Sequence, residues 1–511
     1  MIENLIALPV LLPILGAGIV LTLPRRPRIQ RAVSIGTLLG VVIVAGILMY
    51  LTDQHGTLAL WVGGWPSPLG IALVADRLSS LMLLVASVVS FSVLVFATGQ
   101  DEAELKRETP VSIFHPAFLL LSAGVSDAFL AGDLFNLFVG FEILLFASYV
   151  LLTLGGTRDR MRAGTTYVIV SLLSSTFFLI SLATIYGATG TVNFAHLSER
   201  LAQLSPQVQL LLQFLLLMTF AIKAAIFPLS SWLPDSYPTA PAPVTAVFAG
   251  LMTKVGVYAI IRTQTLLFPD SRLSSLLLVA SLLTMVIGIL GAVAQVEIKR
   301  MLSFVLVSHL GYMIMGIALA NELGMSATIY YTAHHITIQA VLFLLAGLIE
   351  RHGGTTNLDG LGGLMRTAPF LAVLFFIPAM NVGGIPPMSG FIGKLALLRA
   401  GADLGTPLAW VVMTGSVVTS LLTLMAMAKV WNRAFWGVSP VGAGQVDAGL
   451  QEETGSRKLM PPMMAVATSG LVLFSLAFTF LAGPLTDYAG RAATELDGPS
   501  YVNVVLQGGE R

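Results

Sequence analysis

The chain has 511 residues, a formal net charge of +1 at pH 7, 56% hydrophobic residues and only 10% charged residues. A soluble globular domain carries roughly 25% charged residues, so this composition excludes that class and predicts an integral membrane protein. The absence of cysteine excludes thiolate ligands for an iron–sulfur cluster. The near-neutral charge gives no reason to expect nucleic-acid binding, and we expect no cofactor, no metal site and no catalytic residue.

Apolar runs long enough to cross a bilayer, about 20 residues each, follow one another along the chain. Their centres lie near residues 14, 42, 88, 121, 144, 175, 218, 252, 282, 311, 338, 380, 420 and 471. We therefore predict an all-α integral membrane protein with about 14 transmembrane helices, in which residues 1–511 form a single polytopic domain.

Basic residues in the predicted loops gather after odd-numbered helices, as in the PRRPR segment that follows the first helix. Cytoplasmic loops of membrane proteins carry an excess of lysine and arginine. This pattern predicts a multi-pass membrane protein with both termini on the outer side.

The fifth predicted helix contains a carboxylate, Glu142, about nine residues or roughly 14 Å from Asp133 at the membrane edge. Ionisable residues near the bilayer midplane are costly and by default functional. The alternative is a static ion pair that only fixes helix packing. Four serines of the sixth helix are interpreted as interhelical contacts: Ser171, Ser174, Ser175 and Ser181.

The seventh predicted helix is interrupted, because Pro228 follows Lys223 by five residues in AIKAAIFPLSSWLPDSYP. Lys254 lies in the middle of the eighth helix among aliphatic residues, and Lys429 lies near the polar end of the thirteenth. A buried lysine exchanges its proton readily, which suits a relay. The alternative for each lysine is a side chain that extends to the membrane surface.

The eleventh predicted helix contains adjacent histidines in YYTAHHITIQAVLF. They point about 100° apart, so only one of them can line a given path. We favour His335, because it shares a helix face with Tyr331 and Gln339; the alternatives are His334 as the lining residue, or a histidine that only packs. For His309, in the tenth helix, gating and a bond to a helix backbone remain equal alternatives.

A second interrupted helix, the twelfth, contains IPAMNVGGIPPMSGFIGK and the lysine Lys394. Its helix-breaking residues are Gly383, Gly384, Pro386 and Pro387. Interrupted helices in matching halves are typical of transporters with inverted repeats. We predict that helices 4–8 (residues 111–263) repeat as helices 9–13 (residues 272–436), with helices 7 and 12 discontinuous and their lysines in matching positions.

Three long segments resemble a known family. FPLSSWLPDSYPTAPAPVTAVFAGLMTKVGVYAIIR, IKRMLSFVLVSHLGYMIMGIAL and IPPMSGFIGK are similar to the antiporter-like subunits shared by respiratory complex I, membrane-bound hydrogenases and Mrp cation/proton antiporters. The similarity covers about residues 70–435. Within the family, GDLFNLFVGFEILLFASYVLLTLGG most resembles the D-type subunits of Mrp antiporters.

The resemblance implies a role for five residues as a hydrated proton pathway. Glu142 and Lys223 match the family's charge pair, Lys254 its central lysine, His335 its helix 11 histidine and Lys394 the charge of the second broken helix. One position departs from the pattern. Gln339 stands where family members often have a lysine, so the link between the two half-channels has to depend on His335, Gln339 and water.

The resemblance therefore implies the proton-translocating subunit of an Mrp-type Na⁺/H⁺ antiporter in the bacterial inner (plasma) membrane. Its expected partners are small membrane subunits and a large A-type subunit of the same complex, together with protons, Na⁺ and membrane lipid. The main alternative is the corresponding subunit of a redox-driven pump, either a complex I-type NADH:quinone oxidoreductase or a membrane-bound hydrogenase. A solute carrier, the third class, would have few buried charges, and the four membrane lysines argue against it.

Overall fold

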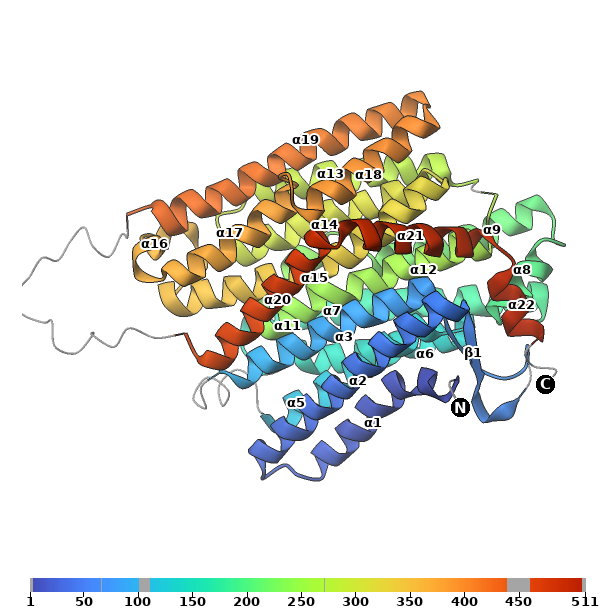
Figure 1. Ribbon diagram of the computed structural model, residues 1–511, viewed down its shortest axis with the longest axis horizontal. Helices are drawn as coiled ribbons and strands as arrows, with labels where there is room; N and C mark the ends of the chain where they lie inside the picture. Colours follow the sequence, from blue (N-terminus) through green and yellow to red (C-terminus); the bar gives the residue numbers. More distant parts are fainter. Residues whose placement is uncertain (1–2, 66, 101–110, 271, 439–459, 508–511) are drawn as a thin grey trace, which may run out of the picture.

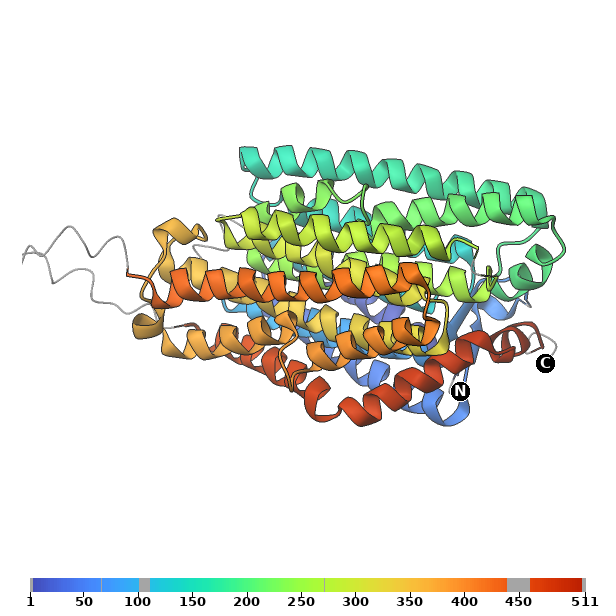
Figure 2. The same ribbon diagram turned by 90° about the horizontal axis from the view of Figure 1, so that it is seen from above.

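The computed structural model describes residues 3–65, 67–100, 111–270, 272–438 and 460–507. In these ranges the chain forms a bundle of long helices that run side by side (Figures 1 and 2). Among the described residues, thirteen helices are long and apolar enough to cross a membrane. The structure confirms the predicted all-α membrane architecture.

The described elements, in chain order, are η1 (Glu3–Ala7), α1 (Leu8–Leu21), α2 (Pro27–His55), β1 (Leu58–Trp61), η2 (Val62–Gly64), β2 (Ala72–Ala75), α3 (Arg77–Thr98), α5 (Val111–Leu130), α6 (Leu134–Thr153), α7 (Arg158–Thr189), α8 (Phe194–Leu201), α9 (Pro206–Lys223), α10 (Trp232–Ser236), η3 (Tyr237–Thr239), α11 (Ala242–Val247), η4 (Phe248–Met252), α12 (Thr253–Leu266), α13 (Ser274–Ala294), α14 (Ile298–Ala318), α15 (Glu322–Gly353), η5 (Leu358–Gly360), α16 (Leu364–Thr367), α17 (Pro369–Gly383), α18 (Ser389–Leu404), α19 (Pro407–Val430), η6 (Trp431–Trp436), α20 (Pro462–Phe480), α21 (Ala482–Asp497) and α22 (Ser500–Gln507).

The predicted twelfth crossing differs from the others in length. Its centre, near residue 380, falls on α17, which has 15 residues and is shorter than the roughly 20 that a bilayer requires. After a break, α18 continues toward the other end of the bundle (Figure 1). This crossing is therefore made of two half-helices.

Helices of the bundle differ strongly in burial. The apolar window of Ala242–Leu266 is buried completely and those of Ile298–Ala318 and Glu322–Gly353 to 94%, whereas that of Arg158–Thr189 is buried to only 39%. Polar residues on α12, α14 and α15 therefore meet other protein groups rather than lipid. The candidate pathway residues of these helices lie in the centre of the protein.

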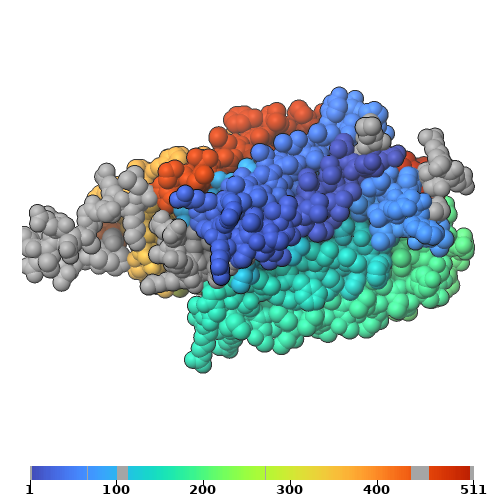
Figure 3. All heavy atoms as spheres, turned by 90° about the horizontal axis from the view of Figure 1, so that it is seen from below, coloured from blue at the N-terminus to red at the C-terminus, as the bar shows by residue number. Residues whose placement is uncertain are grey.

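Both described ends of the chain, near Glu3 and Gln507, lie at one end of the bundle, which we call the terminal end (Figure 1). The antiparallel hairpin β1–β2, with Leu58 opposite Ala75, lies there too. The space-filling view shows the N-terminal helices, in dark blue, across one face of the bundle (Figure 3). The last residue, Arg511, is outside the described residues.

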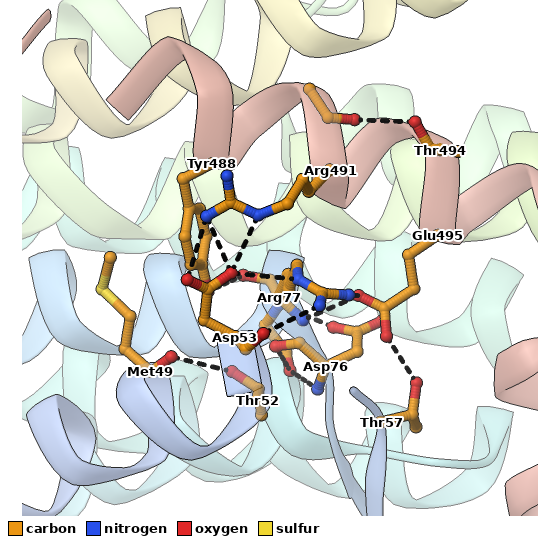
Figure 4. Close-up of polar contacts among 12 residues, drawn as sticks. Met49, Thr52, Asp53, Thr57, Asp76, Arg77, Tyr488, Arg491, Thr494 and Glu495 are labelled. Carbon is orange, nitrogen blue, oxygen red and sulfur yellow. Dashed lines mark hydrogen bonds and ion pairs between the residues drawn. The ribbon is translucent and has the colours of Figure 1, made fainter. Parts of the chain in front are cut away.

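A network of ion pairs joins α21 to the adjoining ends of α2 and α3 at the terminal end (Figure 4). Arg77 lies 3.2 Å from Asp53 and 3.0 Å from Glu495. Arg491 of α21 contacts the same Asp53 at 2.8 Å. The network fixes the last helices of the chain against the first ones.

Two short bridges between loops have the same form at opposite ends of the bundle. Asp133 caps the start of α6 and pairs its backbone with Asn193. Glu297 caps the start of α14 and pairs its backbone with Asn357. In both cases the partner follows the acidic residue by 60 positions.

Candidate functional site

Two crossings are interrupted in the middle of the bundle. α9 ends at Lys223, and Pro228 lies in the segment before α10. α17 ends at Gly383, and the segment before α18 contains Gly384, Pro386 and Pro387. Proline removes a backbone donor, so both interruptions leave main-chain groups outside the helical pattern. Such groups persist at membrane depth only where protein or water meets them.

At the first interruption, a serine hydroxyl connects a carboxylate to a lysine. Ser175 of α7 donates a hydrogen bond to Oε1 of Glu142 on α6. The same hydroxyl accepts a hydrogen bond of 3.2 Å from Nζ of Lys223. A hydroxyl can do both at once, since it has one proton and two lone pairs. The described residues show no direct ion pair between Glu142 and Lys223.

Lys223 is enclosed by aromatic and hydroxyl groups. Its Nζ lies 5.1 Å from the centre of the Phe141 ring, a favourable position for a cation over an aromatic face. A cavity of about 20 Å³ beside it is lined by Tyr167, Ser171 and Trp232, among others. That volume is enough for one water molecule. Lys223 therefore has room for one water molecule beside it, in addition to its contact with Ser175.

The central lysine follows a turn of π-helix. Lys254 is fully buried, and its Nζ donates a hydrogen bond of 2.5 Å to the carbonyl of Ala249, inside η4. A π-turn often occurs at functional sites and shifts backbone carbonyls out of the regular pattern. Here the irregular turn supplies the lysine with an acceptor in the protein interior.

The histidines form a stack with a tyrosine. The ring of His309 on α14 lies 5.0 Å from that of His335 on α15, and its Nδ1 is 2.7 Å from the hydroxyl of Tyr331. Neither ring nitrogen of His335 contacts a partner within the described part of the protein, although the residue is fully buried. Buried polar groups are nearly always hydrogen bonded, so we expect water to hydrogen-bond to the ring nitrogens of His335.

The second histidine of the pair faces another element. Nδ1 of His334 lies 3.0 Å from the hydroxyl of Ser389, the first residue of α18. Gln339 donates a hydrogen bond of 2.9 Å to the carbonyl of Leu302, and so joins α15 to α14. His334 therefore contacts the second interruption, whereas His335 faces α14.

At the second interruption, the lysine meets neutral groups only. Nζ of Lys394 donates hydrogen bonds to the carbonyl of Val382 at 3.0 Å and to the hydroxyl of Ser420 at 2.9 Å. It also lies 5.0 Å from the centre of the Tyr312 ring. Lys223 precedes its break, whereas Lys394 follows its own, and the predicted match of the two lysines stays a prediction. Lys394 reaches back across the break to the carbonyls at the end of α17.

Lys429 contacts the end of a neighbouring helix, unlike the other membrane lysines. Its Nζ donates hydrogen bonds to the carbonyls of Val293 at 3.1 Å and Gln295 at 2.7 Å, at the end of α13. The last carbonyls of a helix lack partners within the helix, and a lysine can satisfy them. Lys429 thus caps α13 and does not join the central groups.

Sequence reasoning missed the serine that connects the charges. The interpretation as interhelical contacts fits Ser174, which donates to the carbonyl of Thr219, but Ser175 contacts two charged groups. Tyr312 and Ser420 were not singled out either. The signal that was available is the cluster SLLSST opposite the helix of Glu142, although its spacing does not tell which serine faces the charges.

Comparison with known proteins gives consistent matches. Residues 131–423 match the family model described as NADH:quinone oxidoreductase/Mrp antiporter, TM. The D subunit of a Na⁺/H⁺ antiporter from Alkalihalophilus pseudofirmus is 38% identical over 99% of this chain and 100% of its own, and the Bacillus subtilis D subunit is 33% identical with the same coverage.

Solved structures match over the same length. A chain of the Mrp complex from Dietzia sp. has a TM-score of 0.89 and 34% identity, with 99% of this chain and 100% of that chain covered. A chain of an archaeal membrane-bound sulfane sulfur reductase has a TM-score of 0.85 and 27% identity, with the same coverage.

Proposed function

The chain belongs to the transmembrane NADH:quinone oxidoreductase/Mrp antiporter family, and from this we propose that it is the proton-translocating D-type subunit of an Mrp-type Na⁺/H⁺ antiporter. In this function it is part of a secondary transporter and not an enzyme. It works with the other proteins of its complex, small membrane subunits and the large A-type subunit, in the bacterial inner membrane. Protons and Na⁺ are the transported ions.

The relatives favour the antiporter over a redox-driven pump. The two D-type subunits named above are 33–38% identical to this chain, whereas the respiratory sulfur reductase chain is 27% identical. The composition of the purified complex separates the two functions. Purification of the chain with iron–sulfur or flavin proteins would identify a pump.

The observation that carries the proposal is the contact of Glu142, Ser175 and Lys223. The carboxylate balances the charge of the protonated lysine through one hydroxyl, so a change of charge on either residue alters the proton affinity of the other. A purely structural ion pair would not need space for a water molecule beside the lysine, and a cavity of about 20 Å³ lies there. We therefore assign the three residues to a proton switch.

From the switch, protons pass through the buried centre of the protein. The relay groups in order are Lys254 on α12, His335 on α15 and Lys394 on α18, with His309 and Tyr331 beside the histidine. Their amines and ring nitrogens either meet neutral acceptors or lack a protein partner among the described residues. Water completes the connections between them, and Gln339 holds α14 and α15 together at the crossing point.

The experiment that tests this function changes the carboxylate alone. Glu142→Gln keeps size and hydrogen-bonding capacity but removes the charge, so we expect an assembled complex with antiport near background; Glu142→Asp keeps partial activity. The measurement is Na⁺-induced collapse of a pH gradient in everted vesicles, with assembly checked on a native gel. The matched control is Glu199→Gln, at an exposed position of α8. Near-normal antiport in assembled Glu142→Gln complexes would show that the carboxylate contributes only to helix packing.

Transport requires the whole complex. Because a relative of this chain occurs as one chain of the Mrp complex, we expect no Na⁺-driven proton flux from liposomes that contain only this purified chain. Flux from such liposomes would show that the chain transports ions alone.

We propose that the terminal end faces outward. The end opposite to it carries Arg25 and Arg26 between α1 and α2, Arg162 at the start of α7, and Arg300 at the start of α14. This is the distribution expected of a cytoplasmic face. A cysteine added after Arg511 in this cysteine-free chain is expected to react with an impermeant thiol reagent in intact cells. Labelling only after lysis would contradict this orientation and would place the C-terminus in the cytoplasm.

We also propose that residues 111–263 and 272–436 are inverted repeats. Two features support this division: each half contains one interrupted crossing, and each contains the bridge between a capping acid and an asparagine 60 residues later. The two bridges lie at opposite ends of the bundle, as inversion requires.

A further inference from the structure

An apolar groove lies on the surface of the bundle between α5 and α6, in the half away from the terminal end. Its volume is about 440 Å³, and residues of α1, α5 and α6 line it. The buried side chains of Ala117 and Ala147 form its floor, and Leu21, Phe146 and Val150, which are 40–60% exposed, form its rim. The lining side chains are all apolar, so the groove suits a hydrocarbon chain.

The groove follows from the way in which α5 and α6 pack. Nearer the terminal end the two helices touch through a glycine, since a Cβ on Gly124 of α5 would lie 2.5 Å from the backbone nitrogen of Leu144 on α6. Farther from that end, Ala117 and Ala147 lie at the floor of the groove, and their side chains are too small to fill the space. The small residues therefore leave a groove beside a close helix contact.

Three exposed arginines follow α1 in the chain, and we call them the arginine cluster: Arg25, Arg26 and Arg28. Leu21, on the rim of the groove, is the last residue of α1. The side chain of Gln30 on α2 donates a hydrogen bond of 3.0 Å to the carbonyl of Val20, next to Leu21. This bond holds the start of α2 against the end of α1, so the arginine cluster lies beside the mouth of the groove.

The positive charge of the cluster is not balanced within the described ranges, where none of its arginines forms an ion pair. The acids of the adjoining helices are distant: Asp53 of α2 and Asp127 of α5 lie near the terminal end, and Glu142 lies in the middle of α6. α2 also begins without a side-chain cap and without an acid in its first turn. The positive end of its dipole adds to the arginines, so the position favours an anion.

We propose that the groove and the arginine cluster form a binding site for one anionic phospholipid, with its phosphate on the arginines and one acyl chain in the groove. The guanidinium group matches the geometry of a phosphate. The cluster lies at the end of the bundle that is proposed to face the cytoplasm, where anionic lipids attract basic residues next to membrane helices. A phospholipid accounts for both features together, because its charge lies at the membrane surface and its chain within the membrane.

The acyl chain would lie along the part of α6 that carries the proposed switch. Ile143 lines the groove and directly follows Glu142 in the chain. The segment from Ile143 to Val150 is about 10 Å of helix at 1.5 Å per residue. The site thus adds a lipid to the surroundings of Glu142, although its existence does not depend on the transport function.

The test is quenching, by brominated phospholipids, of a tryptophan placed on the rim. Phe146→Trp introduces this reporter, and its signal is the difference from the complex without the substitution. The purified complex is reconstituted in phosphatidylcholine vesicles with rising fractions of brominated phosphatidylglycerol or, in parallel, of brominated phosphatidylcholine. We expect half-maximal quenching at an at least fivefold lower fraction of phosphatidylglycerol, since each arginine near the surface attracts an anionic headgroup.

Two variants of the reporter complex separate the headgroup from the chain. Replacement of the whole cluster, by Arg25→Gln, Arg26→Gln and Arg28→Gln, is expected to abolish the preference for phosphatidylglycerol. Ala147→Leu fills the groove and keeps the arginines, and we expect it to reduce the preference to less than twofold.

The control removes basic charge from the same end of the bundle without touching the groove. Arg162→Gln combined with Arg366→Gln replaces two exposed arginines, one at the start of α7 and one in α16. We expect this variant to keep the full preference for phosphatidylglycerol. Loss of the preference in the control would mean that the lipid responds to the overall charge of this end and would overturn the site.

Three further results would also overturn it. Equal quenching by the two lipids before any arginine is replaced would mean that other groups neutralise the cluster, such as the acids of residues 101–108, which lie outside the described residues. Absence of quenching by both lipids would mean that another subunit covers the groove. An unchanged preference with Ala147→Leu would mean that the headgroup binds without the groove.

The first two of these results need only the reporter substitution, so they decide the matter even if the arginine variants do not assemble. All measurements are made without a Na⁺ gradient. They are therefore independent of whether the complex exchanges Na⁺ for protons, and failure of the lipid site leaves the proposed antiport function untouched.

Discussion

The two interrupted crossings place a lysine in the membrane in different electrostatic surroundings. At the first, the positive charge of Lys223 faces a carboxylate across the hydroxyl of Ser175. At the second, the charge of Lys394 faces carbonyl and hydroxyl dipoles and an aromatic ring. A full negative charge can hold or release a proton as it changes, whereas fixed dipoles cannot. We therefore propose that the first break acts as a switch and the second as a passage.

The largest expected effect comes from removal of the lysine that the switch controls. Lys223→Ala leaves Glu142 without its counter-charge, and we expect antiport near background in an assembled complex. Lys429→Ala is the matched control, since that lysine caps α13 at the membrane edge. The assay is the vesicle measurement described above. Substantial antiport with Lys223→Ala would show that the carboxylate works without this lysine.

A carboxylate introduced at the second break gives Lys394 an acidic neighbour, as Lys223 has at the first break. Ser420→Asp places an acid at the residue whose hydroxyl lies 2.9 Å from Nζ of Lys394. An adjacent opposite charge holds a lysine's proton about tenfold or more tightly, so we expect antiport to fall by about tenfold. Ser420→Asn, of equal size and without charge, is expected to stay close to the wild type. Equal rates for the two variants would mean that charge at this break is unimportant.

Loss of the bridging hydroxyl has a smaller effect. Ser175→Ala removes a hydrogen bond from both charges, and water replaces part of it, so a cost of about 1 kcal/mol, or about fivefold in antiport rate, is expected. The neighbouring Ser174→Ala removes a bond to the Thr219 carbonyl only and serves as the control. If both alanine variants transport equally fast, Ser175 is an ordinary interhelical contact.

The smallest effect on antiport is expected at Lys429, the lysine that caps α13. Lys429→Gln keeps a donor for the end of α13 but removes the charge, so antiport is expected to stay within about twofold, with a stability loss of about 0.5 kcal/mol. Thermal denaturation of the purified complex measures the second quantity. A loss of antiport comparable to that of Lys223→Ala would place Lys429 in the proton pathway.

The crossings and the interruptions were predictable because they are local in the sequence. An apolar run defines a membrane helix, and Pro228 or Pro387 defines a break without reference to other helices. The short length of α17 was less evident, since the apolar run around residue 380 continues through the glycines that end the helix. The resemblance to a family supplied the roles of Lys254 and His335, which composition alone did not give.

Contacts between distant segments were not predictable. Ser175 connects residues 33 and 48 positions away, and nothing in its own helix separates it from Ser174. Arg262 ends the apolar segment VGVYAIIR, and nothing in that segment indicates that the structure buries it against Asp76 within the bundle. The hydrogen bond of Asn136 to Asp127 likewise depends on how α5 and α6 pack. Such positions require the three-dimensional arrangement of the helices.

The most direct test of the central claim is whether Glu142 and Ser175 act as one unit with Lys223. Glu142→Asp shortens the side chain and breaks its contact with Ser175, and Ser175→Ala removes the same contact from the other side; both singles keep measurable antiport. Initial rates are compared for the singles and the double variant in assembled complexes. We predict a double variant about as active as the slower single, because residues that share one interaction are not additive. A loss equal to the product of the two single losses would contradict the account.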